Sequence, residues 1–305
     1  MTTATTVDLS KAPSYKTLPT KVVFTLRDYR LYALSIGIHS SNLHFLYEND
    51  PCLSAFPTYP LVLAFKRDNH GVSIYDDAGS DAIPGIPPLR PQHCGPCTVT
   101  GVCDKGKGMA IERTAQLVDP KGVARPYATM MGSAFVKGRS GWGGPRGPAT
   151  AGVKKLESLD PPKDKAPGHV FEDSTHPDQA ILYHLSGDYN PLHIDSEIAP
   201  MAELECSIPH GLCTYGHSAQ AIPKTFGNSD PRAFRSITGR FSAPVLLGNT
   251  LVTKMWNVPF SSSSPEDKSQ TRIFFQTFAK ERDFLVINSG CVVLQNLSTP
   301  TQSKL

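Results

Sequence analysis

The 305-residue sequence has no run of about 18 consecutive apolar residues, the length that a membrane-spanning helix needs. It also has no basic N-terminal block followed by an apolar core, the pattern of a secretory signal peptide. Its net charge of +3 is small, and no basic stripe with interleaved aromatic residues occurs, which argues against nucleic acid as a partner. These absences favour a soluble globular protein. A hydrophobic content of 39% suffices for one substantial core or for two ordinary domains.

The sequence also lacks a regular cysteine framework. Its seven cysteines are an odd number and lie scattered at positions 52, 94, 97, 103, 206, 213 and 291, which favours a reducing compartment over disulfides. Cys94-Gly95-Pro96-Cys97 copies a redox motif, but that motif must open a helix, and the β-rich run 98–102 follows it. His93 has no second ligand pair at zinc-finger spacing. We therefore expect a strand here and no metal site.

Hydrophobic periodicity predicts the elements of the first half. Residues 26–36 have apolar side chains at helical spacing, and residues 43–48 alternate like a strand. Two more strands are predicted at 97–103 and 108–118, joined by a turn rich in glycine and charge. A dense run of glycine, proline and charged residues begins at 138, so we predict a linker at 139–168 between domains 1–138 and 169–305.

The second half is predicted to contain two helices followed by strands. Thr175 is the predicted hydroxyl cap of a helix that runs to about Leu185. The apolar spacing of residues 211–222 indicates a buried central helix, with Pro223 as its stop. Four antiparallel strands are predicted at 234–245, 250–256, 271–280 and 284–294.

One stretch of the second half, YHLSGDYNPLH at 183–193, carries the chemistry. It places a carboxylate, a carboxamide and an imidazole within six residues, at Asp188, Asn190 and His193. Pro191 blocks helix continuation and biases Asn190 toward an extended backbone, so a short stiff loop should hold the other two groups. An aspartate and a histidine that share one water suit addition of water to an activated double bond, or its removal. Gly187-Asp188 alone would favour a simple turn, but the full set at fixed spacing favours a site.

The stretch, continued to Ala199 and again over 209–221, resembles the signature of the hydratase 2 family, or MaoC-like (R)-specific 2-enoyl-CoA hydratases. The resemblance implies that Asp188 and His193 activate water, that Asn190 supports them, and that the N–H of Gly211 holds the thioester oxygen. Gly211 opens the predicted central helix, where free N–H groups and the helix dipole favour negative charge. We expect His210 to pack or hydrogen-bond at that helix start, and His184 and His217 to be structural.

The stretches LRDYRLYALSIG and LHFLYENDP resemble the opening of the N-terminal half of double hot-dog hydratases. The expected fold is therefore α+β, a double hot-dog in which two antiparallel sheets each wrap around a central helix. Because only the second half carries the motif, the first hot-dog should be a degenerate copy that builds the substrate tunnel. The His-Gly pair that lines the acyl site in relatives is not found at 71–93, so the sequence predicts no particular length for the acyl group of the substrate.

The resemblance also implies substrate contacts. Lys105 lies in the turn whose lysine touches CoA in the family, although a solvated turn lysine is an equal alternative. Phe241 lies in a segment that resembles the family's RFxxPVxxGxTL run, where the Phe lines the substrate site; it is otherwise a core aromatic. The motif residues Tyr189, Pro191 and Leu192 are also predicted to contact substrate.

The C-terminal tripeptide Ser303-Lys304-Leu305 reads as a peroxisomal address, with chance at a polar terminus as the alternative. It predicts binding to a peroxisomal import receptor and a peroxisomal location.

Taken together, the resemblance implies a carbon–oxygen lyase that reversibly hydrates trans-2-enoyl-CoA to (3R)-3-hydroxyacyl-CoA, as in peroxisomal β-oxidation. The substrate arrives as an acyl-CoA thioester, no metal or other cofactor is expected, and a homodimer is expected. Two alternatives stay open at this point. One is a dehydratase or hydratase of secondary metabolism that acts on an unusual acyl thioester, and the other is a non-catalytic acyl-CoA-binding hot-dog protein.

Overall fold

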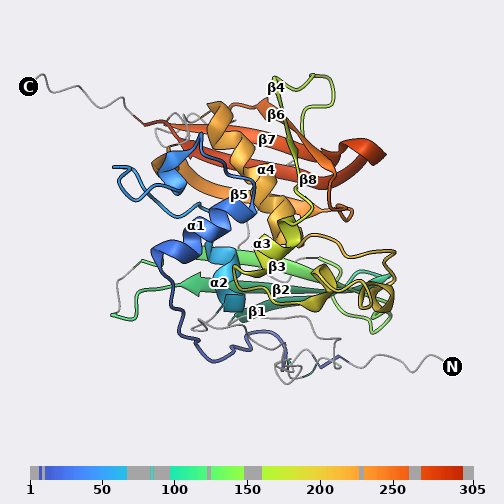
Figure 1. Cartoon of the computed structure of the whole chain (residues 1–305). Coiled ribbons are helices and arrows are strands. Elements are labelled where there is room, and N and C mark those ends of the chain that lie inside the picture. Colours follow the sequence, from blue (N-terminus) through green and yellow to red (C-terminus); the bar gives the residue numbers. More distant parts are fainter. Residues whose placement is uncertain are drawn as a thin grey trace, which may run out of the picture. The chain divides into compact units, whose positions relative to one another are not determined.

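A computed structural model describes residues 7–8, 11–66, 83, 85, 97–121, 125–147, 160–226, 230–260 and 269–297. The chain forms two compact units, one of Met1–Val23 with Pro60–Leu156 and one of Phe24–Tyr59 with Glu157–Leu305 (Figure 1). Residues 24–59 thus precede the predicted linker in the sequence but pack in the C-terminal unit. The division into domains 1–138 and 169–305 with a linker at 139–168 stays a prediction. Across the described ranges, no helix is both long enough and apolar enough to cross a membrane.

The N-terminal unit contains a three-stranded antiparallel sheet in the order β1-β2-β3. The elements of this unit are α2 (Pro60–Lys66), β1 (Thr98–Asp104), β2 (Gly108–Leu117) and β3 (Ala128–Lys137). Val102 of β1 pairs with Ile111 of β2, and both side chains lie in a buried cluster with Val99 and Met109. β1 and β2 confirm the two predicted strands, whereas β3 was not predicted.

The C-terminal unit contains a five-stranded antiparallel sheet in the order β4-β6-β7-β8-β5 (Figure 1). Its strands are β4 (His169–Ser174), β5 (Phe234–Phe241), β6 (Thr250–Asn257), β7 (Gln270–Ala279) and β8 (Phe284–Gln295). The inner strands supply core side chains such as Met255, Phe275 and Val292, all fully buried. The four strands predicted at the end of the chain are confirmed, and β4 was not predicted.

Helix α4 (Gly211–Phe226) lies across this sheet (Figure 1). Every residue from Cys213 to Pro223 is buried, as expected of a helix that is surrounded by other elements. A sheet wrapped around one buried helix is the hot-dog arrangement, so the predicted α+β hot-dog architecture is confirmed.

The segment 24–59 contributes α1 (Leu26–Ser35) and the 3-10 helix η1 (Leu43–Phe45). α1 confirms the predicted helix, and a capping box of Thr25 and Asp28 starts it. α1 packs against α3 (Gln179–His184). A Cβ added to Gly216 of α4 would lie 2.4 Å from Ile36 Cγ2, so the chain after α1 approaches α4 more closely than any larger residue would allow.

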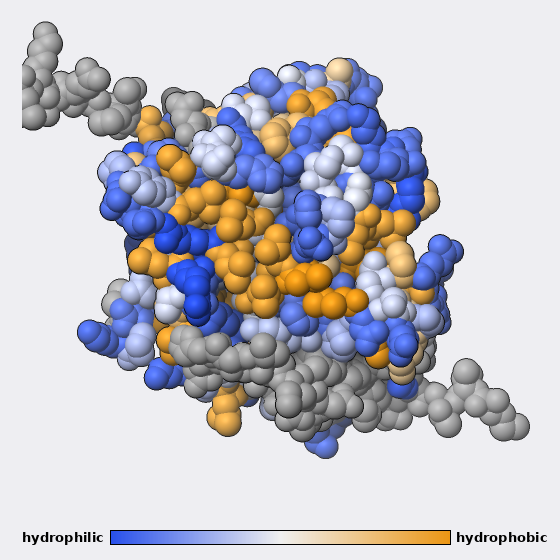
Figure 2. Space-filling model, in the orientation of Figure 1, coloured by the Kyte–Doolittle hydropathy of each residue, from blue (hydrophilic) through white to orange (hydrophobic). Residues whose placement is uncertain are grey.

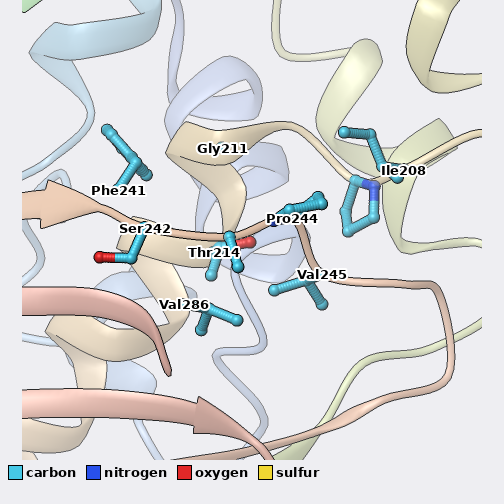
Figure 3. A pocket seen from close by; sticks show the side chains of 10 residues that line it. Ile208, Gly211, Thr214, Phe241, Ser242, Pro244, Val245 and Val286 are labelled. Atoms are coloured by element: carbon cyan, nitrogen blue, oxygen red, sulfur yellow. The ribbon is translucent and has the colours of Figure 1, made fainter. Parts of the chain in front are cut away.

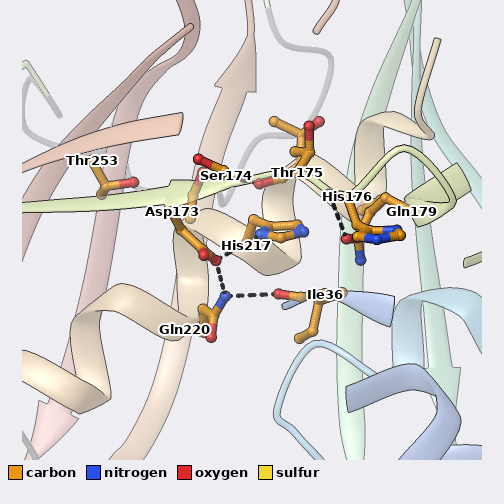
Figure 4. Close-up of polar contacts among 12 residues, drawn as sticks. Ile36, Asp173, Ser174, Thr175, His176, Gln179, His217, Gln220 and Thr253 are labelled. Carbon is orange, nitrogen blue, oxygen red and sulfur yellow. Dashed lines mark hydrogen bonds and ion pairs between the residues drawn. The ribbon is translucent and has the colours of Figure 1, made fainter. Parts of the chain in front are cut away.

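A buried polar network reinforces this approach (Figure 4). Gln220 Nε2 donates to the carbonyl of Ile36 and to Asp173 Oδ2 of β4, both at 2.8 Å. His217 Nδ1 lies 3.1 Å from the same Asp173 oxygen. The network therefore ties α4 to β4 and to the end of α1, and His217 takes part in it.

The surface of the C-terminal unit also carries apolar side chains. Leu26, Leu34, Ile181 and Leu185 of the α1 and α3 region are 46% to 49% exposed. Hydrophobic residues also form patches on the face of the molecule shown in Figure 2. Exposed leucines are common in folded proteins, so these residues alone assign no interface.

Three details of the sequence prediction are wrong. Residues 43–48 form no strand: η1 occupies 43–45, and Leu43 is 45% exposed, so the alternation does not follow the face of a sheet. Thr175 does not cap α3, because its hydroxyl donates to the carbonyl of Asn249 at 3.0 Å and the cap residue is Asp178. Pro223 does not end α4, which runs to Phe226, because a proline within the last turn removes only one hydrogen bond.

Candidate active site

The motif loop begins where α3 ends. Gly187 has a φ of +128°, a conformation that residues with side chains rarely adopt, and it turns the chain into Asp188. Asn190 has the extended backbone that Pro191 was predicted to impose, with φ −64° and ψ 118°. Its side-chain oxygen accepts from the N–H of Leu192 at 3.1 Å and so caps the 3-10 helix η3 (Pro191–His193). The cap fixes the point from which His193 projects.

The segment before α4 holds the other side of the site. The carbonyl of Ile208 accepts a hydrogen bond from His193 Nδ1 at 2.9 Å. Because this nitrogen carries the proton, the Nε2 of a neutral His193 has a free lone pair. His210 Nε2 donates to the backbone carbonyl of Asp188, also at 2.9 Å. Two backbone carbonyls thus orient the two imidazoles.

Asp188, His193 and His210 converge. A carboxylate oxygen of Asp188 and one ring nitrogen of each histidine all lie within 4.8 Å of one another. One water can bridge such a separation, because each of its hydrogen bonds spans about 2.8 Å. The loop therefore brings together the two groups that the sequence predicted would share a water.

Burial sets the charge of each group. It raises the pKa of the Asp188 carboxyl to about 6, against a smaller opposing effect of the Asn190 N–H. Burial also lowers the pKa of His193, and the Ile208 carbonyl only partly offsets this. Near neutral pH the site therefore holds an ionised carboxylate beside a neutral imidazole, a pair that can accept a proton from water.

A pocket of about 320 Å³ opens at the start of α4 (Figure 3). Gly211 lies between Phe241 and Ile208 in this view. The N–H of Gly211 belongs to the first turn of α4, where no intrahelical acceptor exists and the helix dipole is positive. The remaining lining is mostly apolar: Pro209, Thr214, Ser242, Ala243, Pro244, Val245 and Val286. The pocket thus combines an apolar wall with a donor suited to a carbonyl oxygen.

The structure places the other predicted contact residues as follows. Tyr189 packs edge-on against His184, with ring centroids 5.0 Å apart. Pro191 and Leu192 lie in η3, and neither they nor Tyr189 line the pocket. Lys105 lies between β1 and β2 of the N-terminal unit, and its ammonium donates to the carbonyl of Arg146 at 2.8 Å. The described residues do not include Ser303, Lys304, Leu305 or most of the segment 71–93.

Two groups in the described part of the chain bring three potential metal ligands within 4.8 Å of one another. One is Asp188, His193 and His210; the other is His44, Asp50 and Cys52. In the second group, Asp50 Oδ1 already accepts from His44 Nδ1 and from the Cys52 N–H, at 2.9 and 2.8 Å. The expected absence of a metal stays a prediction.

The sequence did not identify the roles of Ile208 and Val286. Ile208 acts through its backbone carbonyl, which no side-chain pattern reveals. Val286 reaches the pocket from β8, whose alternation fits any core strand. Only Pro209 and Gly211, just after Ile208, marked its segment as unusual.

Comparison with known proteins gives the family. Residues 159–272 match the model of the MaoC like domain, and residues 23–81 match that of the MFE-2 hydratase 2 N-terminal domain. A Dictyostelium discoideum protein named probable enoyl-CoA hydratase 2 is 31% identical over 95% of this chain and 97% of its own length. The Arabidopsis thaliana protein named enoyl-CoA hydratase 2, peroxisomal, is 30% identical over 94% of this chain and 95% of its own.

A solved structure extends the likeness to the fold. The crystal structure of a MaoC-like dehydratase from Phytophthora capsici is 31% identical, with a TM-score of 0.77 over 96% of this chain and 100% of that chain. Sequence and fold agree over nearly the whole length, as the motif resemblance predicted. The chain belongs to the family of MaoC-like hydratase 2 proteins.

Proposed function

We propose that the protein catalyses the reversible addition of water to trans-2-enoyl-CoA, with (3R)-3-hydroxyacyl-CoA as product. The observation that carries the proposal is the separation of the Asp188 and His193 side chains, within 4.8 Å, on a loop fixed by hydrogen bonds between side chains and the backbone. The relatives named enoyl-CoA hydratase 2 support the choice of substrate class.

The reaction follows from the charge states. One water is held between the Asp188 carboxylate and the free nitrogen of His193, and its proton passes to this pair as its oxygen bonds to C3. The C2–C3 π electrons move toward the thioester carbonyl, whose oxygen becomes enolate-like and accepts from the N–H of Gly211. A proton returned to C2 completes the addition, so the whole water is used and the enzyme is regenerated.

The reverse reaction uses the same groups, because protonated Asp188 can return a proton to the leaving hydroxyl. The Phytophthora relative is named a dehydratase, which favours this direction as the second candidate function. We further propose that the protein acts in the peroxisome, which is supported by Ser303-Lys304-Leu305 and by the name of the Arabidopsis relative. We also propose a homodimer, which light scattering after gel filtration would measure.

A panel of enoyl-CoA and 3-hydroxyacyl-CoA thioesters of different lengths tests the activity, with loss or gain of the enoyl ultraviolet absorbance as the signal. Asp188→Asn and His193→Ala should each lower turnover by roughly 10² to 10⁴, the range for loss of a positioned acid or base. Circular dichroism should show that both variants are folded. Folded variants with near-full activity would refute the site, and binding without turnover by the unmodified protein would indicate an acyl-CoA-binding protein instead.

A further inference from the structure

His210 occupies the N-cap position of α4. Its carbonyl accepts from the N–H groups of Cys213 and Thr214 at 3.0 and 3.2 Å, the first hydrogen bonds of the helix. Its side chain, in a residue only 1% exposed, points to the motif loop and donates to the Asp188 carbonyl. One residue therefore fastens the backbone of Asp188 to the start of the helix that carries Gly211.

The same ring covers His193. The centroids of the two imidazoles are 3.8 Å apart and their planes meet at 31°, while Tyr183 packs near His210 at 4.8 Å. The Ile208 carbonyl fixes one edge of the His193 ring, and His210 restricts its rotation about that hydrogen bond. With both restraints, the free nitrogen of His193 keeps one direction.

His210 can do this as a neutral ring. Its Nδ1 is buried without a hydrogen-bond partner among the described residues, so a proton there would have no acceptor. The pKa of His210 is lowered to about 2, mainly by burial, and the neighbouring His193 and His184 lower it further. Among the described residues, the Asp188 carboxyl and the aromatic ring of Tyr183 also lie against the His210 ring. A neutral ring adds no positive charge beside His193, which must hold a proton during the reaction.

We propose that His210 is a positioning residue, which keeps the Asp188 carboxylate and the His193 ring aligned on one water by tying the Asp188 backbone and covering the His193 ring. The proposal rests on the proposed hydration activity. His210 affects catalysis through the geometry of the site, because a displacement of about 1 Å can lower the rate roughly 10²-fold.

Two variants separate the two contacts. His210→Gln keeps a donor for the Asp188 carbonyl and loses the ring, whereas His210→Phe keeps the ring and loses the donor. His217→Phe is the matched control, because His217 is, like His210, a buried histidine; it lies within α4 and has one hydrogen-bond partner among the described residues, Asp173. We expect both His210 variants to lower kcat on crotonyl-CoA by roughly 10 to 10², with KM changed much less. His217→Phe should lower the melting temperature and leave kcat unchanged.

Nitrogen-15 NMR of the histidine rings gives a readout independent of activity. In the unmodified protein, His193 should be a single neutral tautomer with its proton on Nδ1, and His210 should carry its proton on Nε2. In the His210→Gln variant we expect His193 to exchange between tautomers. If the unmodified protein hydrates no enoyl thioester but this exchange is seen, the proposed function fails and the positioning of His193 stands. Unchanged His193 spectra, or a fall in kcat no larger than that of His217→Phe, would overturn the proposal.

Discussion

Burial raises the pKa of Asp188 to about 6, and among the described residues the backbone N–H of Asn190 opposes this effect. The proposed reaction needs the ionised form, because a protonated carboxyl cannot accept a proton from water. We therefore expect kcat/KM to fall about tenfold per pH unit below about pH 6, whereas an ordinary aspartate would sustain it to about pH 4. Initial rates between about pH 5 and pH 8 would show this limb, and a rate independent of pH over this range would contradict it.

The same pKa makes a prediction about stability. The pKa of Asp188 is about 6 in the folded protein and 3.8 in the unfolded chain. The protonated carboxyl therefore contributes its full stabilisation of the fold below pH 3.8. This contribution is lost as the pH rises through about 6. At pH 7 the buried charge therefore destabilises the protein, and Asp188→Asn removes it. We expect this variant to be more stable at pH 7 by roughly 1 to 3 kcal/mol and to gain little near pH 4. Urea unfolding at both pH values measures the difference; equal gains at the two pH values would exclude the charge as the cause.

At the scale of elements, the start of α4 supplies the proposed hydrogen-bond donor, the N–H of Gly211, which one substitution can remove. Proline is tolerated at the first helical position, where its missing N–H has no intrahelical acceptor, so Gly211→Pro should leave α4 intact. Loss of the proposed donor should lower kcat by roughly 10² to 10³.

Gly211→Ala is the control for this variant, because it keeps the N–H. An added Cβ would lie 3.4 Å from Phe241 Cε1, a contact that needs only a small adjustment. Steady-state kinetics should place Gly211→Ala well above Gly211→Pro. Equal losses in the two variants would mean that space, and not the hydrogen bond, matters at this position.

The elements that the sequence predicted are those whose pattern is set locally. α1 has a capping box and helical spacing, and β6, β7 and β8 are rich in buried apolar residues. β4 and β3 were missed because their side chains are largely exposed, so no hydrophobic face stands out in either sequence. Residues 43–45 alternate as a strand would but form a 3-10 helix, in which Phe45 is buried and Leu43 is exposed.

At the scale of the whole molecule, the sequence could predict which residues converge but not how they are held. The motif spacing predicted that Asp188 and His193 would lie together, and Gly211 came from the resemblance. The two hydrogen bonds that orient the imidazoles span 15 and 22 residues, and each ends on a backbone carbonyl. Such contacts depend on how the motif loop meets the segment before α4, which no local pattern encodes.

The C-terminal tripeptide gives a prediction about location. A fluorescent protein fused to the N-terminus leaves Ser303-Lys304-Leu305 free, and we expect the fusion to collect in peroxisomes. Removal of the three residues should leave it in the cytosol. Microscopy against a peroxisomal marker decides this, and puncta that persist after removal would show that the tail is not the address.

The stereochemistry of the product tests the site as a whole. If Asp188 and His193 hold one water on one face of the flat enoyl thioester, hydroxide delivery to C3 and protonation at C2 occur on that face, so addition is syn. The Gly211 N–H limits the thioester to one pose relative to that water, and the family relationship sets the 3R sense. Reaction of crotonyl-CoA in D₂O, followed by dehydrogenases specific for the 3R or 3S alcohol and by NMR of the deuterium at C2, measures both. A 3S product would refute the proposed reaction, whereas a 3R product formed by anti addition would keep the reaction and refute the shared water.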